Sequence, residues 1–546
     1  MTTVVSYQSA VQAGQDGLWR LLRAEWTKFR TVRGWVIAIA LAPVLSVVLA
    51  VMPFVGHSPS CHQQGTAAAC PPPQAPPTGP GGDAVVDTFY FAHETLTGNG
   101  AITVRLASLT GKYAPNGVPA NGNSTAGYES GVQPWSKAGI MVSAGTAQGS
   151  AYAAMLATGS NGVRMQWNYT GDTAGLPGRV SASSPRWLRL VRSGDTVTGY
   201  DSADGTRWTQ VDRVTLSGLP RSAQVGMFAT SPDYQVISNG LGTSTGNVTP
   251  SLATGTFDHV DLAWGRAGAS TAWTGTSVGD GNGTRDSPAA GGPFAGTFTQ
   301  AGTGTGKAYT VTGSGDIAPD VPGDPDGAAG QDRESLLSTV IIGLIVMIIV
   351  AALFITAEYR RGLIRLTFAA SPRRGRVLAA KVVVVGAVTF AAGLIGAVVA
   401  LLLGTHLMRS AGNAVIGVPA LTQVRMAVGV GAMLAIESVL ALALGTLVRR
   451  GVTAVTLVIV VIFVPFFMAV FQGLLPLSAV DWLLRISPAA AFAVVQDTPA
   501  YHQVFTQYTP AGGFFPLPWW AGLAVAGGWT VAALAGAACA LRRRDA

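Results

Sequence analysis

Six apolar runs along the chain are long enough to cross a bilayer, which requires about 20 residues. They lie at about 35–55, 336–357, 379–404, 426–447, 452–474 and 519–541. The first two are separated by a long segment that contains no such run. The spacing therefore predicts six transmembrane helices with a large insertion between the first and the second.

Within this insertion, short runs of alternating apolar and polar residues are separated by turn residues. The runs lie at 101–108, 138–144, 152–158, 162–169, 186–194, 196–202 and 225–231. Strands at this spacing indicate an antiparallel β-sandwich. Asp204-Gly205 predicts a hairpin turn. The Pro/Gly-rich stretch at 57–83 is predicted to be a linker, and the Gly/Ser/Thr-rich stretch at 266–295 is predicted to be a loop.

The predicted fold is a polytopic α-helical membrane domain that carries an inserted all-β domain. The predicted division is a cytoplasmic tail and interface helix (1–33), transmembrane helix 1 (34–55), a linker (56–86), the sandwich (87–320), a second linker (321–333) and transmembrane helices 2–6 (334–546). The last part includes a cytoplasmic loop at 357–381 and an exterior segment at 475–518, which is too polar and too broken to cross a membrane.

Composition and charge agree with this mixed architecture. Only 11% of the residues are charged, against about 25% in soluble domains, so an ordinary soluble enzyme is excluded. The basic clusters at 20–33, 360–381, 449–450 and 542–544 fall on one side if both termini are cytoplasmic. The positive-inside rule then places 56–333 outside the cell. Topology thus accounts for the net charge of +8, and no nucleic-acid partner is expected.

Residues 17–30 have an amphipathic helical pattern. Leu18, Leu22, Trp26 and Phe29 recur at helical spacing among basic residues. Such a helix is typical of a membrane interface, and the alternative is a soluble docking helix.

Three further residues are candidates for special roles. Cys61 and Cys70 lie in the predicted linker. A disulfide between them would stabilise the fold by roughly 2–3 kcal/mol, and the alternative is two free thiols. Glu437 is an acid within a predicted span. Intramembrane acids are costly and often functional, although Glu437 could equally form a hydrogen bond to a neighbouring helix.

The strand sequences resemble a known family of exterior domains. FYFAHETLTGNGAITVRLAS, PWSKAGIMVS and RWLRLVRSGDTVTGYDSADGTRWTQV, within 87–265, resemble the concanavalin-A-like (laminin-G-like) jelly roll of secreted bacterial proteins. A string typical of its first strand, YTVTGSGDI, lies instead at 309–317, which implies a circularly permuted sandwich that this segment completes.

The acidic residues of this domain indicate binding, or plain protein–protein contact, rather than catalysis. Paired carboxylates, which glycosidases require, do not occur together on one predicted strand, so binding is expected rather than hydrolysis. Trp135, Trp167, Trp187 and Trp208 are candidates for stacking on sugars, and the alternative for each is a place in the sandwich core.

The membrane part resembles a second family. LWRLLRAEWTKFRTVRGW and the loop AEYRRGLIRLTFAASPRRGRVLAAK resemble the permease subunits of ABC-2-type exporters. This resemblance implies that the loop seats on an ATPase, and that 475–518 forms re-entrant exterior helices. The matching coupling residues are Glu358, Arg360, Arg361, Gly362, Leu363, Arg365, Pro372, Arg373 and Arg374. The alternative reading of this loop is a topology signal with no partner.

The expected function is the permease subunit of an ATP-driven exporter in a bacterial plasma membrane, and not an enzyme. The sequence contains no Walker A motif, so ATP and Mg²⁺ are expected on a separate ATPase subunit. A second permease subunit, identical or different, membrane lipid and cell-wall glycan are the other expected partners. The competing function is a non-transporting multi-pass protein that displays a lectin-like domain.

Overall fold

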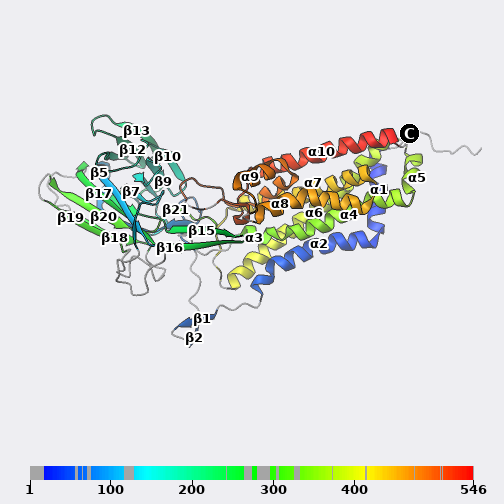
Figure 1. Ribbon diagram of the computed structural model, residues 1–546, viewed down its shortest axis with the longest axis horizontal. Helices are drawn as coiled ribbons and strands as arrows, with labels where there is room; N and C mark the ends of the chain where they lie inside the picture. The colour runs from blue at the N-terminus through cyan, green and yellow to red at the C-terminus, as the bar shows by residue number, and fades with distance from the viewer. Residues whose placement is uncertain are drawn as a thin grey trace, which may run out of the picture.

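The computed structural model describes most of the chain. The described residues are 17–55, 60–63, 66–69, 76–115, 128–240, 243–263, 273–279, 295–302, 306–324, 333–371, 373–411, 413, 415–471, 474–504, 506 and 508–544. The molecule is elongated, with a helical bundle at one end and β-sheets at the other (Figure 1).

Among the described residues, six helices are long and apolar enough to cross a membrane, which confirms the predicted number. They are α2 (Arg33–Val51), α4 (Val340–Arg360), α6 (Arg374–Ser410), α7 (Ala420–Val448), α8 (Gly451–Val470) and α10 (Trp519–Arg544). The shorter helices are α1 (Leu18–Thr31), α3 (Arg333–Ser338), α5 (Leu363–Ala370) and α9 (Leu477–Ile486).

Helix α6 is much longer than the apolar run that predicts it. Its 37 residues extend about 55 Å at 1.5 Å per residue, whereas the hydrocarbon core is about 30 Å thick. The helix starts at Arg374 rather than near residue 379, because RGRVLAAK contains no helix-breaking proline and continues the helix beyond its apolar part.

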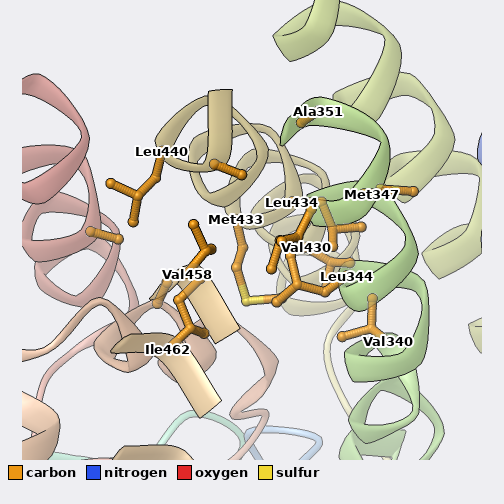
Figure 2. Packing of buried hydrophobic residues seen from close by; sticks show 14 of the residues in the cluster. Val340, Leu344, Met347, Ala351, Val430, Met433, Leu434, Leu440, Val458 and Ile462 are labelled. Carbon is orange, nitrogen blue, oxygen red and sulfur yellow. The ribbon is translucent and has the colours of Figure 1, made fainter. Parts of the chain in front are cut away.

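Helix α7 lies in the middle of the bundle and packs against α4, α6 and α10. Figure 2 shows this core, in which side chains of α4, α7 and α8 interdigitate: Val340, Leu344, Met347, Ala351, Val430, Met433, Leu434, Leu440, Val458 and Ile462. A Cβ added at Gly393 of α6 would lie 2.5 Å from Leu434. Small residues thus permit the close helix contacts that hold membrane bundles together.

The segment between α8 and α10 does not cross as a straight helix. Helix α9 and the 3₁₀ helix Pro488–Val495 meet at Ser487 with a bend of 101°. Pro488 has no amide hydrogen to continue the preceding helix, which accounts for a break at this point. We call residues 477–515 the cap, because α9 lies at the end of the bundle that faces the β-sheets (Figure 1).

Two antiparallel sheets form the sandwich, as predicted. The smaller sheet has the order β10 (Gly171–Ala174), β9 (Val163–Trp167), β8 (Tyr152–Thr158), β7 (Lys137–Ser143), β14 (Ser222–Thr230), β4 (Phe89–Thr97) and β18 (Thr274–Val278). The larger has the order β13 (Thr209–Thr215), β12 (Thr196–Ser202), β11 (Arg186–Ser193), β5 (Gly100–Tyr113), β17 (Ser251–Ala263), β20 (Ala308–Gly313) and β19 (Thr297–Ala301), with β6 (Glu129–Ser130) beside β5.

The strand order supports two of the finer expectations. Strand β20, which overlaps the string at 309–317, lies in the larger sheet between β17 and β19. Strands β12 and β13 form a hairpin, and Gly205 has the positive φ of 76° that such a turn favours. The jelly-roll assignment and the circular permutation stay predictions.

The central strands of the smaller sheet are buried on both faces. Every residue of β7 and β8 is buried, so these strands read as continuous apolar runs rather than strict alternation. One face lies against the core between the sheets, which includes Ile140 and Met155. The other face contacts a second cluster, to which Tyr169 and Ile317 belong.

Two segments differ from their predicted character. Residues 266–295 were expected to form a loop, but they include β18, which pairs with β4 at the sheet edge. The predicted linker 56–86 includes the hairpin β1 (Ser60–Gln63) and β2 (Thr66–Ala69). It also includes most of β3 (Val85–Asp87), which pairs with β21 (Ile317–Pro319). Strands β18 and β3 pair with strands far away in the sequence, and local composition does not reveal such partners.

Strands β15 (Tyr234–Gly240) and β16 (Thr243–Thr249) form a hairpin, which is a separate two-stranded sheet. The predicted disulfide involves Cys70, which lies outside the described residues, as does the side chain of Cys61.

The sandwich rests directly on the cap. Gln503 is buried and its Nε2 donates a hydrogen bond to the carbonyl oxygen of Tyr169 at 2.9 Å. The hydroxyl of Thr506 donates to the carbonyl oxygen of Gly323 at 2.9 Å. Beside these bonds, Val321 after β21 packs in a small apolar cluster with Phe514 of the cap. The contact therefore joins the two halves of the molecule through both polar and apolar groups.

A buried carboxyl lies close to this contact. Asp87 Oδ2 accepts hydrogen bonds from the hydroxyl of Tyr169 at 2.7 Å and from the backbone amide of Gly149 at 2.8 Å. Burial raises the pKa of Asp87 to about 7, because it disfavours the charged form more than these two bonds favour it.

This pKa predicts a pH-dependent stability of the sandwich. Below about pH 4 the carboxyl holds its proton in the folded and the unfolded chain alike. Between about pH 4 and pH 7 the folded state keeps the proton that the unfolded chain releases, so rising pH favours unfolding. We expect the urea midpoint of the detergent-solubilised protein, followed by tryptophan fluorescence, to fall across this window.

The Asp87→Asn variant isolates the contribution of this carboxyl. One amide oxygen can accept both hydrogen bonds, since both donors meet the same oxygen in the wild type. The midpoint of the variant should therefore fall less between about pH 4 and pH 7. Asp195→Asn, at an exposed position, serves as the control. Identical pH profiles for wild type and Asp87→Asn would contradict the assignment.

Candidate functional site

Helix α1 is joined to the bundle by an aromatic cluster. Phe29 is buried, and its ring centroid lies 5.9 Å from that of Phe354 in α4 and 6.3 Å from that of Trp35 in α2. Trp35 meets Phe354 edge to face at 5.2 Å. Phe29 of α1 thus packs against two transmembrane helices, whereas Leu18, Trp19 and Trp26 on the same helix are exposed.

Four charged side chains meet beside these aromatic rings. Lys381 Nζ lies 2.7 Å from carboxylate oxygens of both Glu25 and Glu358. Lys28 Nζ lies 2.8 Å from Glu25 and 3.2 Å from Glu358. We call Glu25, Lys28, Glu358 and Lys381 the four-charge cluster. It connects α1, the end of α4 and the start of α6, and the formal charges sum to zero.

Most of the four-charge cluster is shielded from solvent. The side chains of Lys381, Glu25 and Glu358 are 1%, 2% and 9% exposed, whereas that of Lys28 is 39% exposed. Burial alone would lower the pKa of Lys28. The hydrogen bond and charge of Glu25, with those of Glu358, outweigh that effect and raise its pKa above the ordinary value. Lys28 therefore stays charged.

The loop that follows α4 starts from this cluster. Gly362 has a φ of 68°, a left-handed conformation that costs glycine little. It lies in the turn between α4 and α5. The hydroxyl of Thr367 in α5 accepts a hydrogen bond from Lys28 Nζ at 3.4 Å. Figure 1 shows α1 and α5 together at the end of the bundle opposite the sandwich.

The structure separates the predicted coupling residues into an inward and an outward set. Glu358 points inward, to Lys28 and Lys381. Arg360, Arg361, Gly362, Leu363 and Arg373 are exposed, and Leu366 beside them is 68% exposed.

The remaining coupling residues are placed only in part. Arg374 donates a hydrogen bond to the carbonyl oxygen of Leu541 at 2.6 Å, which ties the start of α6 to the end of α10. The backbone of Arg365 lies in α5, but its side chain is outside the described residues, and so is Pro372.

The sequence pattern did not predict Glu25 as a site residue, and it predicted Lys28 and Lys381 only as topology charges. A signal did exist: Glu25 is the single acid among the basic residues of α1, and it precedes Lys28 by three positions, a spacing at which helical side chains meet. The partner on α6 gives no such signal, because Lys381 lies 356 positions away.

Glu437 lies apart from the four-charge cluster, in the middle of α7. It is 1% exposed, and neither carboxylate oxygen has a hydrogen-bond partner among the described residues. A hydrogen bond to a neighbouring helix is thus absent from the part of the chain that the structure describes. A role for Glu437 in transport stays a prediction.

The four tryptophans predicted as candidates for stacking on sugars are all at least half-buried. Trp135 is 7% exposed, with the Arg164 guanidinium 5.5 Å from its ring centroid. Trp167 packs against the core between the sheets. The structure brings only Trp187 and Trp208 together, on either side of Gly205.

Other side chains already cover the rings of this pair. Arg189 lies 3.9 Å from the centroid of Trp208, and the ring of His259 lies 5.3 Å from that of Trp187. Stacking on a sugar would require these side chains to move.

The described ranges hold no candidate metal site. No group of three or more His, Cys, Asp or Glu residues in them is arranged to bind a metal ion.

These features define a multi-pass membrane protein with a β-sandwich at one end and, at the other, helices joined by buried ion pairs. The family model described as ABC-2 family transporter protein matches residues 140–546, which is most of the chain. The chain therefore belongs to the ABC-2 transporter family.

Other comparisons add little. No curated protein matches the chain. Two structures of scytalido-glutamic peptidase, with a peptide-based transition-state analogue and with a transition-state analogue inhibitor, are each 8% identical. The first covers 43% of this chain and 99% of its own (TM-score 0.22), and the second 41% and 98% (TM-score 0.24). A functionally unknown protein from Saccharomyces cerevisiae is 15% identical over 38% of this chain and 92% of its own (TM-score 0.18). TM-scores this low support no inference about the fold or the function of this chain.

The burial of the four-charge cluster predicts a large effect of removing one member. Lys381→Met leaves two buried carboxylates with one partly exposed lysine, and breaking a buried pair in this way costs about 3–5 kcal/mol. We expect a clearly lower melting temperature in detergent, and a smaller decrease for Lys28→Met.

A double-mutant cycle tests whether the cluster acts as a unit. Glu25→Gln combined with Lys381→Met should destabilise the protein less than the sum of the two single changes. Either single change leaves the charge of the other residue without its partner, whereas the double variant removes both charges. Strictly additive decreases in melting temperature would show that the residues do not interact.

Proposed function

We propose that the chain is the transmembrane permease subunit of an ATP-driven exporter, energised by a separate ATPase subunit. Membership of the ABC-2 transporter family supports this function. In addition, six membrane-crossing helices exceed what the display of a single exterior domain requires. ATP and Mg²⁺ would bind to the ATPase, and two permease subunits would pair.

The observation that carries this proposal is the surface around α5. Leu363 and Leu366 are 44% and 68% exposed, and Arg360, Arg361 and Arg373 are exposed beside them. Apolar side chains surrounded by cations, on a short helix outside the bundle, suit a protein partner with acidic and apolar groups. Arg365 and Pro372 stay predicted coupling residues, on the resemblance alone.

Glu358 has a different proposed role from that of its neighbours. It is buried in the four-charge cluster, so we assign it to holding α4 against α1 and α6 rather than to touching the ATPase. A push on α5 would then reach three helices at once, since Lys28 contacts both Thr367 of α5 and Glu358 of α4. Gating motions of transporters are largely such rigid-body shifts.

For the sandwich we propose a gating or substrate-contacting role on the outer side of the membrane. Its contact with the cap through Gln503 and Thr506 supports gating, because movement of the cap would move the sandwich. The covered rings of Trp187 and Trp208 count against simple sugar stacking. Binding of cell-wall glycan or substrate elsewhere on the domain stays part of the proposal.

The ATPase contact predicts that charge reversal on the α5 surface disrupts the complex. Arg361→Glu and Leu366→Asp should each reduce recovery of the ATPase subunit with the affinity-tagged chain about tenfold, which corresponds to roughly 1.4 kcal/mol. Arg485→Glu, an exposed position on α9 in the cap, is the matched control. Equal recovery from all three variants, or no ATPase with the wild type, would refute the exporter function.

The proposed topology predicts which residues are reachable from outside. In a background without Cys61, Cys70 and Cys539, a membrane-impermeant maleimide applied to intact cells should label Thr206→Cys, which is exposed in the sandwich. It should label Leu366→Cys only after the cells are lysed. The reverse pattern would invert the orientation.

A further inference from the structure

A long apolar groove lies between α1, α2 and α6. Its volume is about 650 Å³, within the range of small-molecule sites, about 300–1,000 Å³. The walls are almost entirely aliphatic, and Arg30 is the single charged residue that lines the groove. The groove faces outward from the bundle, since Val44 and Ile395 on its rims are 54% and 62% exposed.

Small residues and a proline create this hollow. Ala40 of α2 and Ala392 of α6 leave space between the two helices. Deeper in, a Cβ added at Gly396 would lie 2.8 Å from the Cβ of Pro43. The helices therefore nearly touch at this point and close the floor of the groove.

The length of the groove matches one leaflet of a bilayer. On α2 the lining runs from Val36 to Val48, which is about 18 Å of helix at 1.5 Å per residue. Half of a hydrocarbon core of about 30 Å is roughly 15 Å. The groove thus has the depth of the acyl region in the leaflet that α1 borders.

The charges at the α1 end indicate what occupies the groove. No described residue forms an ion pair or a hydrogen bond with the guanidinium of Arg30. Glu25 is the single acid within residues 17–55, and it is already bound to Lys28 and Lys381. A second copy of the chain docked through the same face would therefore bring cations against cations. An anionic headgroup would supply the missing negative charge.

We propose that this groove binds one acyl chain of an anionic phospholipid, with the lipid phosphate at Arg30. The apolar walls take the place of neighbouring lipid tails, and the guanidinium offers donors that match phosphate oxygens. Because Phe29 lines the groove and also packs against α4, a bound lipid would support α1 beside the four-charge cluster. Lipid binding at this site does not depend on the transport function.

Lipid titration of the delipidated full-length protein tests the proposal. Native mass spectrometry would count bound phosphatidylglycerol and phosphatidylcholine with the same acyl chains. We expect one phosphatidylglycerol to bind about fivefold more tightly than phosphatidylcholine, the effect of about 1 kcal/mol per basic residue near a headgroup. Arg30→Gln should abolish this preference, whereas Arg20→Gln, at an exposed position on the same helix, should keep it.

A second pair of variants tests the acyl-chain site itself. Ala40→Phe fills the groove and should weaken binding of both lipids about tenfold or more. Leu41→Phe, on a side of α2 that does not line the groove, should leave binding unchanged. If Ala40→Phe does not fold, Val44→Trp at the exposed rim is the replacement.

Three outcomes would overturn the proposal. Retention of both lipids by the groove-filling variants would remove the acyl-chain site, and equal binding of the two lipids by the wild type would remove the preference for a headgroup of net negative charge. Efficient chain-to-chain crosslinking through Val44→Cys in membranes would show that a second copy occupies the groove. Binding to the ATPase is measured separately, so its failure would leave the lipid result intact.

Discussion

The arrangement of the helical end depends on the constraint that buried charges must be paired. Three side chains of the four-charge cluster are less than a tenth exposed, and each buried charge would be strongly destabilising without its partners. Lys381 satisfies two carboxylates from two different helices. Because helices α1, α4 and α6 each contribute at least one charge, none of them can shift far without leaving a charge unpaired. The cluster thus favours movement of these helices as one body.

A second junction joins the cap and the sandwich at the opposite end of the molecule. Here the contacts are hydrogen bonds to backbone carbonyl oxygens and a small apolar cluster. Such contacts cost less to rearrange than a buried ion pair, since a lost hydrogen bond between uncharged groups costs less than an unpaired buried charge. The molecule therefore combines a strongly fixed end around α1 with a more easily adjusted end around the cap.

Much of the architecture follows from the sequence alone. Six apolar runs predicted six long helices, and alternation with turn residues predicted a β-sandwich and the hairpin at Asp204-Gly205. These predictions succeed because length and period are local properties of the chain. The boundaries are less well predicted: α6 extends beyond its apolar run, and β18 lies within the expected loop.

The local sequence pattern says least about which residues meet in the four-charge cluster. The sequence marked residues 357–381, but it did not reveal that Glu358 points inward or that Glu25 and Lys381 meet. Those two residues are 356 positions apart, and only the packing of α1 against α6 brings them within 2.7 Å. The covered rings of Trp187 and Trp208, and the groove beside Arg30, depend in the same way on distant neighbours. The sequence thus determined which segments form helices and strands, because local spacing governs burial in each. The tertiary structure decided which charges are buried and which surfaces are open, because these depend on residues that meet only after the chain folds.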